Sequence, residues 1–331
     1  MSSAETGETR VGEILRTSLA ENTRLAYRTG WQRFAAYCDA TGSEPMEATP
    51  ADVADFLVHL ASEPRPPHGT NRPGEPLAVA TIRIYVAAIN REFREQDRDS
   101  PARHPRVAAL LQALGRLSDD RPRKVKALRE HEIASILARC DELERQAQFR
   151  LIASRDAALI AIGFAGALRR SEICALRHDD IEFLGDPEQP DAMFIHVGRS
   201  KTDQAGRGQR IAIPGGDVIR PVARMRHWLN LSGINHGPLF QTMRRGGRLL
   251  GRQLNRSDVP RLVKHYASLI GLDPAHYSGH SLRAGFVTSA AVHHARLDKI
   301  MEVTRHRSAG MVLRYIRQAD AFDDHAGKSF L

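Results

Sequence analysis

Apolar residues recur at helical spacing along most of this 331-residue chain, and that periodicity constrains the fold more than any other feature. From Tyr27 to Cys38, and again from Ile82 to Phe93, large apolar side chains return every third or fourth residue, as on one buried helical face. Thr49, Pro50 and Asp52 supply an N-cap, a first-turn proline and an acid at N3, which predicts a helix from there to about residue 61. We therefore predict an all-helical domain in the first third of the chain.

One stretch breaks the helical pattern. Residues 194–197 and 210–213 are short runs typical of β-strands, and the glycine-containing segment 198–208 between them predicts a hairpin turn. The predicted fold class is mainly α: an all-helical N-terminal domain, then a mostly α domain with one small antiparallel β-sheet. Helices of the second domain are expected at about 129–144, from about 154, and at about 217–231, 257–270, 281–292, 296–303 and 309–319.

The boundary between the two domains is predicted in a charged segment. Residues 119–126 have no apolar period, contain Pro122 and turn from acidic to basic, which is typical of a linker. Such a linker either lies along a phosphate backbone or is simply solvated. The predicted organisation is a disordered tail at 1–11, a helical domain at 12–118, the linker at 119–127 and a second domain at 128–331.

Positive charge is concentrated in the second domain. Residues 1–120 hold 14 basic and 17 acidic residues, a net charge of −3, whereas residues 121–331 hold 34 and 22, a net charge of +12. A basic region of this size favours a polyanionic partner such as nucleic acid. Arginine supplies 42 of the 48 basic residues, which suits phosphate binding but also follows from a GC-rich genome. The candidate phosphate contacts, equally consistent with solvated faces, are Arg24, Arg28, Arg244, Arg245, Arg248, Arg252 and Arg256.

The remaining composition predicts a cytoplasmic protein without a membrane partner. No apolar run reaches the ~18 residues of a membrane span, and the polar N-terminus lacks the apolar segment of a signal peptide. Cys38, Cys140 and Cys174 are scattered and lack metal-ligand spacing, so we expect reduced core residues and no metal site.

Two places in the second domain carry side chains that could serve a catalytic site. Tyr315 lies nine residues after His306, but its neighbours are apolar, and such a tyrosine is ordinarily a core or interface residue. Arg169 follows a strongly apolar helix, where a buried guanidinium is costly unless it meets an anion or a carboxylate. Glu172 supplies a carboxylate, so a structural ion pair would explain both residues.

Two further places have the same ambiguity. Lys201 is one of only six lysines and lies in the predicted hairpin turn, where a lysine is ordinarily solvated. His280 and Arg283 lie three residues apart at a predicted helix start, so both can face one site. A capping histidine beside a surface arginine would have the same spacing. None of these places indicates a function alone.

Together, in the order Arg, Lys, His-x-x-Arg, His, Tyr, these residues resemble the tyrosine recombinase (phage integrase) family. The resemblance covers about 150–320 by motif and 12–118 by layout, as in a two-domain member. The chain departs from the family at Arg305, where glycine is frequent, and at Ala284, where many members have a second histidine. The matching segments are Leu-Arg-Arg-Ser-Glu-Ile at 168–173, the hairpin at 195–202, His-Ser-Leu-Arg at 280–283, and the pair His306 and Tyr315.

The resemblance implies a site-specific DNA recombinase that acts through a 3′-phosphotyrosine intermediate, without metal, ATP or another cofactor. Residues 12–118 would form a core-binding (SAM-like) domain and 128–331 the catalytic domain. The implied partner is double-stranded DNA with inverted-repeat half-sites, bound by a homotetramer on two paired sites that is a monomer or weak oligomer without DNA. The expected location is a bacterial cytoplasm, at the nucleoid, with a bacterial, phage or plasmid gene. Implied catalytic residues are Arg169, Lys201, His280, Arg283, His306 and Tyr315, supported by Glu172.

Two other interpretations stay open on the sequence. A type IB topoisomerase-like enzyme uses the same residue types but relaxes DNA as a monomer. A non-catalytic DNA-binding relative would keep the fold without needing the tyrosine.

Overall fold

The chain divides into two compact units, Met1–Pro122 and Arg123–Leu331, each of which is described by itself. The expected tail at 1–11, most of the expected linker, Lys201 and Arg245 lie outside the described residues. The computed structural model describes residues 21–62, 76–118, 125–186, 188, 190–198, 208–244, 247–306 and 308–319, without the side chains of 21, 22, 314 and 316–319.

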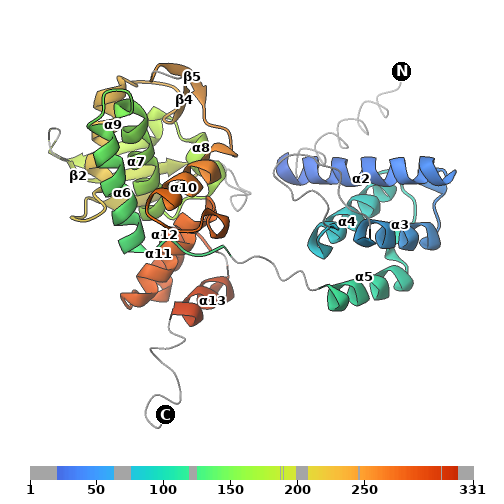
Figure 1. The fold of residues 1–331 in the computed structure, drawn as a ribbon. Coiled ribbons are helices and arrows are strands. Elements are labelled where there is room, and N and C mark those ends of the chain that lie inside the picture. Colours follow the sequence, from blue (N-terminus) through green and yellow to red (C-terminus); the bar gives the residue numbers. More distant parts are fainter. Residues whose placement is uncertain are drawn as a thin grey trace, which may run out of the picture. The chain divides into compact units, whose positions relative to one another are not determined.

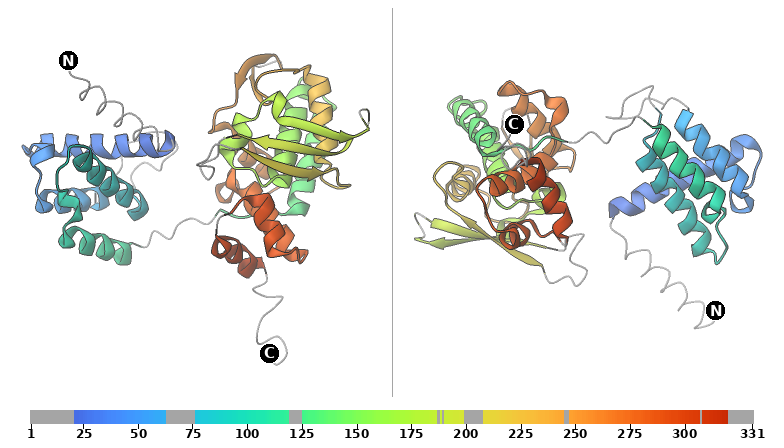
Figure 2. Two further views of the ribbon diagram at one scale, coloured as in Figure 1. Left: turned by 180° about the vertical axis from the view of Figure 1, so that it is seen from behind. Right: turned by 90° about the horizontal axis from the view of Figure 1, so that it is seen from below.

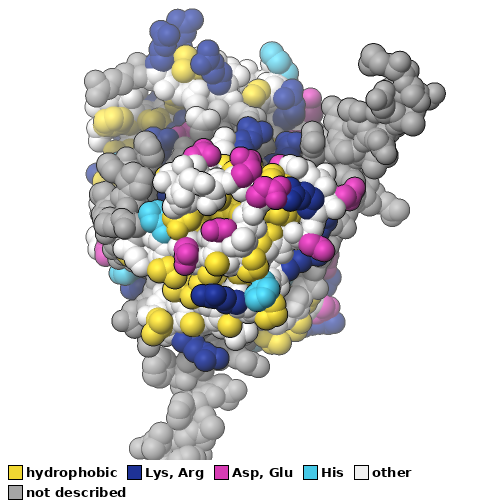
Figure 3. Space-filling view, turned by 90° about the vertical axis from the view of Figure 1, so that its right-hand side faces the viewer, with side chains coloured by type: hydrophobic (Ala, Val, Ile, Leu, Met, Phe, Trp, Pro, Cys, Tyr) yellow, Lys and Arg dark blue, Asp and Glu magenta, His cyan; other side chains and the backbone are white. Residues whose placement is uncertain are grey.

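All regular elements in the described part of the N-terminal unit are helices, as its periodicity predicts (Figure 1). Its core gathers aromatic and aliphatic side chains from different helices, among them Phe34, Phe56, Ile82 and Phe93. On one face of this unit acidic and basic side chains are interspersed (Figure 3). Its elements are α2 (Glu21–Thr41), η1 (Pro45–Glu47), α3 (Pro50–Ser62), α4 (Val79–Glu95), η2 (Pro101–Arg103) and α5 (Pro105–Leu117).

The start of α3 confirms the predicted helix cap. The backbone N–H of Thr49 donates to Asp52 Oδ2 at 2.7 Å, and the Asp52 N–H donates back to Thr49 Oγ1 at 3.3 Å. These bonds satisfy amide groups that a helix start leaves open. The hydrogen bond from the Thr49 backbone also lowers the pKa of Asp52.

The C-terminal unit is built around helix α7 (Arg150–Ala165), whose residues from Ala153 to Phe164 are all buried. Helices α6 (Glu130–Glu144), α9 (Pro221–Ser232) and α11 (His280–Val292) pack against it, which explains why its apolar residues do not form a single stripe. These three helices follow the predicted ranges closely, as do α10 (Asp258–Leu269), α12 (Leu297–Thr304) and α13 (Ala309–Ala319). Three short elements lie outside the predicted ranges: α8 (Arg170–Ala175), η3 (His178–Asp180) and η4 (Pro274–His276).

The prediction of a single β-sheet is wrong in number. Strands β1 (Ile181–Gly185), β2 (Pro190–Val197) and β3 (Gln209–Pro214) form one antiparallel sheet in that order, and β4 (Gln241–Met243) with β5 (Leu249–Gln253) forms a second. The three-stranded sheet lies across the helices of this unit (Figure 2). In β2 and β3, buried and exposed residues alternate, which is the pattern that predicts a strand from sequence. In contrast, β5 is largely exposed and its apolar residues do not alternate with polar ones.

The start of the C-terminal unit is hydrogen-bonded to η4 and α11. The Lys126 N–H donates to the His276 carbonyl at 2.8 Å, and the Leu128 N–H donates to the Ser281 carbonyl at 3.1 Å. Gly285 of α11 is buried against this segment: a Cβ added there would lie 1.7 Å from the carbonyl oxygen of Leu128. Only glycine allows the two backbones to approach this closely.

Gly285→Ala should therefore destabilise the C-terminal unit by roughly 1–3 kcal/mol, because the backbone of residues 125–128 has to move. Gly310→Ala is the matched control, since its added Cβ meets only Ser308 Oγ at 3.5 Å and alanine favours the helix. Urea denaturation of both variants measures the effect. Equal midpoints for Gly285→Ala and the unsubstituted protein would contradict the close approach.

Candidate active site

The segment Leu-Arg-Arg-Ser-Glu-Ile at 168–173 lies where α7 ends and α8 begins. Arg169 is the N-cap of α8, and its backbone N–H donates to Glu172 Oε2 at 2.8 Å. Its side-chain Nη1 donates to Glu172 Oε1 at 2.7 Å. The Glu172 side chain is only 5% exposed, whereas that of Arg169 is 26% exposed. Glu172 thus both caps the helix and holds the Arg169 guanidinium at the surface of the site.

The second arginine is anchored to the turn just before Arg169. Arg283 on α11 is 2% exposed, and its Nη1 donates to the Ala167 carbonyl at 2.7 Å. Ala167 has a φ of 44°, an unusual value for a residue with a side chain, and the turn aims its carbonyl into the site. Among the described residues Arg283 Nη2 has no hydrogen-bond partner. Burial, then the cations of Arg169 and Arg305, lower the pKa of Arg283 to about 9, so it stays charged at neutral pH.

Helix α13 brings Tyr315 to His280. The His280 Nε2 and the Tyr315 hydroxyl lie 2.9 Å apart. Val312 of α13 packs with Val287 of α11 and Ile300 of α12, and Tyr315 lies at the edge of this small core. The neighbouring apolar residues therefore dock the helix, while the tyrosine hydroxyl faces a base.

His280 should remain neutral at neutral pH in the free protein. Loss of solvation around its ring, then the cations of Arg283 and Arg169, lower its pKa from the ordinary value near 6.5. A lowered pKa means that protonation requires a pH below that range. NMR titration, with His280→Gln to assign the resonance, should place the midpoint below ~6.5. An Arg283→Gln substitution should raise it, and a midpoint above the ordinary value in the unsubstituted protein would contradict the arrangement.

His306 is held by a short relay in the turn between α12 and α13. Its Nδ1 lies 2.8 Å from Thr304 Oγ1, and that hydroxyl donates to the Ile300 carbonyl at 2.7 Å. Because the single hydroxyl proton is used, Nδ1 of His306 must be the donor, and Nε2 of the neutral ring is an acceptor. Burial, then the cations of Arg283 and Arg169, lower the pKa of His306 to about 4.

The structure also brings Arg305 into the site, at a position where the chain departs from the family pattern. Arg305 Nη2 donates to Glu172 Oε2 at 2.8 Å, so the same carboxylate serves Arg169 and Arg305. Its side chain is 4% exposed. The sequence signal was its position directly before His306, but an arginine there is ordinarily read as a surface residue.

Of the residues expected at the site, the structure gathers all that it describes; Lys201 lies outside the described residues. The charge effects of Arg169, Arg283, Arg305 and His280 on His306 place the five together. The expected phosphate contacts that the structure describes are exposed to solvent. These are Arg24 and Arg28 on α2, with Arg244, Arg248, Arg252 and Arg256 in and after the β4–β5 hairpin.

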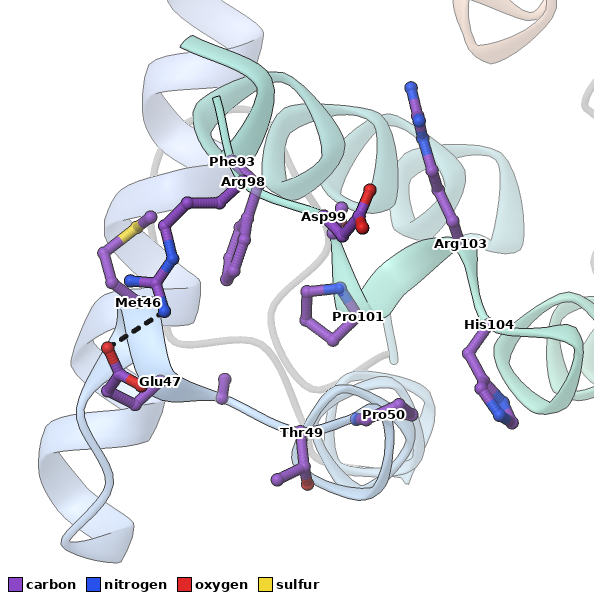
Figure 4. A pocket seen from close by; sticks show the side chains of 12 residues that line it. Met46, Glu47, Thr49, Pro50, Phe93, Arg98, Asp99, Pro101, Arg103 and His104 are labelled. Carbon is purple, nitrogen blue, oxygen red and sulfur yellow. Dashed lines mark hydrogen bonds and ion pairs between the residues drawn. The ribbon is translucent and has the colours of Figure 1, made fainter. Parts of the chain in front are cut away.

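A separate pocket of about 550 Å³ lies on the N-terminal unit (Figure 4). Its wall includes Phe93, Pro101 and Arg103, and the Arg98–Glu47 ion pair of 2.9 Å crosses one side. It holds none of the residues around Tyr315.

Among the described residues, no three or more His, Cys, Asp or Glu side chains come together in a group that could hold a metal ion. No helix in the described part of the chain is long and apolar enough to cross a membrane.

Comparison with known proteins gives the class of this chain. Residues 126–321 match the model of the phage integrase family. An integrase/recombinase XerD homolog of Selenomonas ruminantium is 33% identical over 94% of this chain and 86% of its own length. The Cre recombinase of Escherichia phage P1 is 24% identical over 92% of this chain and 87% of its own.

Solved structures agree in fold. XerH recombinase bound to difH before cleavage superposes with a TM-score of 0.60 at 16% identity, covering 98% of this chain and 85% of that one. A λ integrase (75–356) dimer bound to a COC′ core site gives 0.57 at 16% identity and covers 93% of both chains. The chain therefore belongs to the phage integrase family. Within that family it is a tyrosine-type site-specific recombinase.

Proposed function

We propose that this recombinase cleaves and rejoins DNA strands through a 3′-phosphotyrosine at Tyr315, without metal or ATP. The observation that carries the proposal is the Tyr315 hydroxyl, 2.9 Å from His280 Nε2 and beside arginines with unsatisfied donors. Three guanidinium groups surround a single carboxylate among the described residues, and an anion such as a phosphodiester would balance the excess charge.

The chemistry follows from these groups. A phenol ordinarily ionises only near pH 10, so attack at neutral pH needs a base and nearby positive charge. Neutral His280 accepts the Tyr315 proton as the phenolic oxygen bonds to phosphorus. Arg169 and Arg283 hold the non-bridging oxygens, on which negative charge develops. The bond to the 5′-oxygen breaks, and Lys201 gives that oxygen its proton.

The covalent link makes the step reversible. The phosphotyrosine conserves the energy of the broken phosphodiester bond, so a 5′-hydroxyl from a second strand can displace Tyr315 and complete an exchange. No nucleotide is consumed in either direction.

His306 would change its protonation state on the way. Its neutral tautomer presents an acceptor at Nε2, which cannot donate to phosphate. A bound phosphate anion favours the charged imidazolium, in which both nitrogens donate. We therefore propose that His306 takes up a proton as the scissile phosphate binds.

The two units would both bind DNA. We propose that the segment 12–118 is the core-binding domain and that 128–331 is the catalytic domain, joined by the linker at 119–127. Phosphate contacts would come from Arg24 and Arg28 in the first and from the β4–β5 arginines in the second. The XerH and λ integrase complexes carry DNA, which supports this partner.

The protein would be a monomer or weak oligomer alone and a homotetramer on two paired sites with inverted-repeat half-sites. It would act at a bacterial nucleoid.

The proposal is tested by trapping the intermediate on nicked duplexes taken from DNA flanking the gene. After cleavage, the short fragment that carries the new 5′-hydroxyl diffuses away, so the strand cannot be rejoined. We expect a protein–DNA adduct that survives denaturant. No adduct on any flanking duplex or on a randomised library would contradict the proposal. The topoisomerase alternative is not favoured by the named relatives, and relaxation of plasmids without regard to sequence would revive it.

A further inference from the structure

Arg305 occupies a backbone position that ordinarily suits glycine. It follows the last turn of α12, its N–H donates to the Met301 carbonyl at 2.7 Å, and its φ is 56°. A left-handed backbone is unfavourable for a residue with a Cβ, because the Cβ crowds the following carbonyl oxygen. The backbone at Arg305 is therefore strained in a way that a glycine would not be. The Arg305 side chain is directed inward and almost wholly buried.

The guanidinium of Arg305 reaches the two groups that anchor the other arginines. Its Nη2 donates to Glu172 Oε2 at 2.8 Å, the oxygen that also caps Arg169. The same nitrogen lies 3.4 Å from the Ala167 carbonyl, the acceptor of Arg283 Nη1. Arg305 thus links the anchors of Arg169 and Arg283.

Charge gives this link a second consequence. Without Arg305, the negative charge of Glu172 would neutralise the positive charge of Arg169 alone. With Arg305 present, one carboxylate is shared between two cations. The site around the partly exposed Arg169 then has a net positive charge that attracts a phosphate. Arg305 Nε and Nη1 are also buried and have no hydrogen-bond partner among the described residues. A buried guanidinium whose donors lack partners is costly, so a site that keeps one is expected to use its charge.

We propose that Arg305 is a positioning residue for strand cleavage, which holds Glu172 and so orients Arg169 and Arg283 on the scissile phosphate. The inference rests on the proposed function, because it concerns the rate of the Tyr315 step. It applies to this chain in particular, since glycine is frequent at this position among tyrosine recombinases.

The test compares Arg305→Gly, Arg305→Lys and the unsubstituted protein on one nicked substrate. Cleavage is measured in a single turnover at saturating protein, and DNA affinity is measured separately. We expect Arg305→Gly to keep its affinity and to cleave about 10- to 100-fold more slowly, because the phosphate is misplaced. Arg305→Lys should recover part of the rate, since a lysine keeps the ion pair to Glu172 but not the shared geometry.

Coupling to Glu172 separates positioning from a general loss of stability. In a Glu172→Gln background, Arg305→Gly should cost much less than it does alone, because the carboxylate it holds is already gone. Arg305→Gly also removes backbone strain, so its melting temperature should not fall enough to explain a slower rate.

Four results would overturn the inference. The first is cleavage by Arg305→Gly at the unsubstituted rate, and the second is an undiminished cost in the Glu172→Gln background. The third is a slow cleavage rate that returns to the unsubstituted value at saturating protein, which would mean that Arg305 contributes to DNA affinity and not to cleavage. The fourth is an unsubstituted protein that forms no adduct; the proposed function then fails and takes this inference with it.

Discussion

Tyr315→Phe should abolish the covalent adduct and leave DNA affinity within about twofold. The substitution removes one oxygen, the proposed nucleophile, and keeps the ring at the edge of the small core formed by Val287, Ile300 and Val312. Without a phenolic oxygen no bond to phosphorus can form, so the expected loss is complete. Denaturing gels of the nicked substrate measure the adduct, and a mobility shift measures binding.

Tyr277→Phe is the matched control for this experiment. Tyr277 is in the same unit, three residues before His280, and is buried; burial and then nearby Glu132 raise its pKa. It should form the adduct at close to the unsubstituted rate. An adduct with Tyr315→Phe, or its loss with Tyr277→Phe, would move the nucleophile elsewhere.

Arg169→Lys should slow cleavage roughly 100- to 1,000-fold at saturating protein. A lysine lacks the planar fork that donates to Glu172 while presenting further N–H groups outward, so the phosphate oxygens lose a positioned donor. The rate should fall without a matching fall in affinity, because one contact among many determines binding less than it determines the transition state.

The neighbouring Arg170→Lys is the control for Arg169. Arg170 is exposed and has the same residue type one position along the chain. We expect its rate to change by no more than about twofold. If Arg170→Lys were the slow variant and Arg169→Lys the active one, the assignment of Arg169 to the site would be wrong.

Local signals in the sequence predicted most of the helices. The cap of α3 was readable because Thr49, Pro50 and Asp52 act within one turn, and α13 was readable from its apolar spacing before Tyr315. The mainly α fold class is confirmed in this way. The pair Arg169 and Glu172 was also local, since the two residues are only three positions apart.

Contacts between distant segments were not readable. The β4–β5 hairpin lacks alternation because β5 is exposed, and β1 depends on its pairing with β2. The Arg305–Glu172 ion pair joins residues 133 positions apart, and nothing near Arg305 indicates that its side chain turns inward. The left-handed backbone that directs it inward is a property of the folded turn.

The central claim is that Tyr315 becomes joined to the 3′ phosphate of a cleaved strand, and mapping the adduct tests it most directly. The trapped complex is digested with protease and nuclease, and mass spectrometry locates the nucleotide on the peptide. End-labelled substrates identify which side of the break is attached. We predict a nucleotide on Tyr315, linked through the 3′ phosphate, with a free 5′-hydroxyl on the other fragment. Attachment to any other residue, or through a 5′ phosphate, would contradict the account.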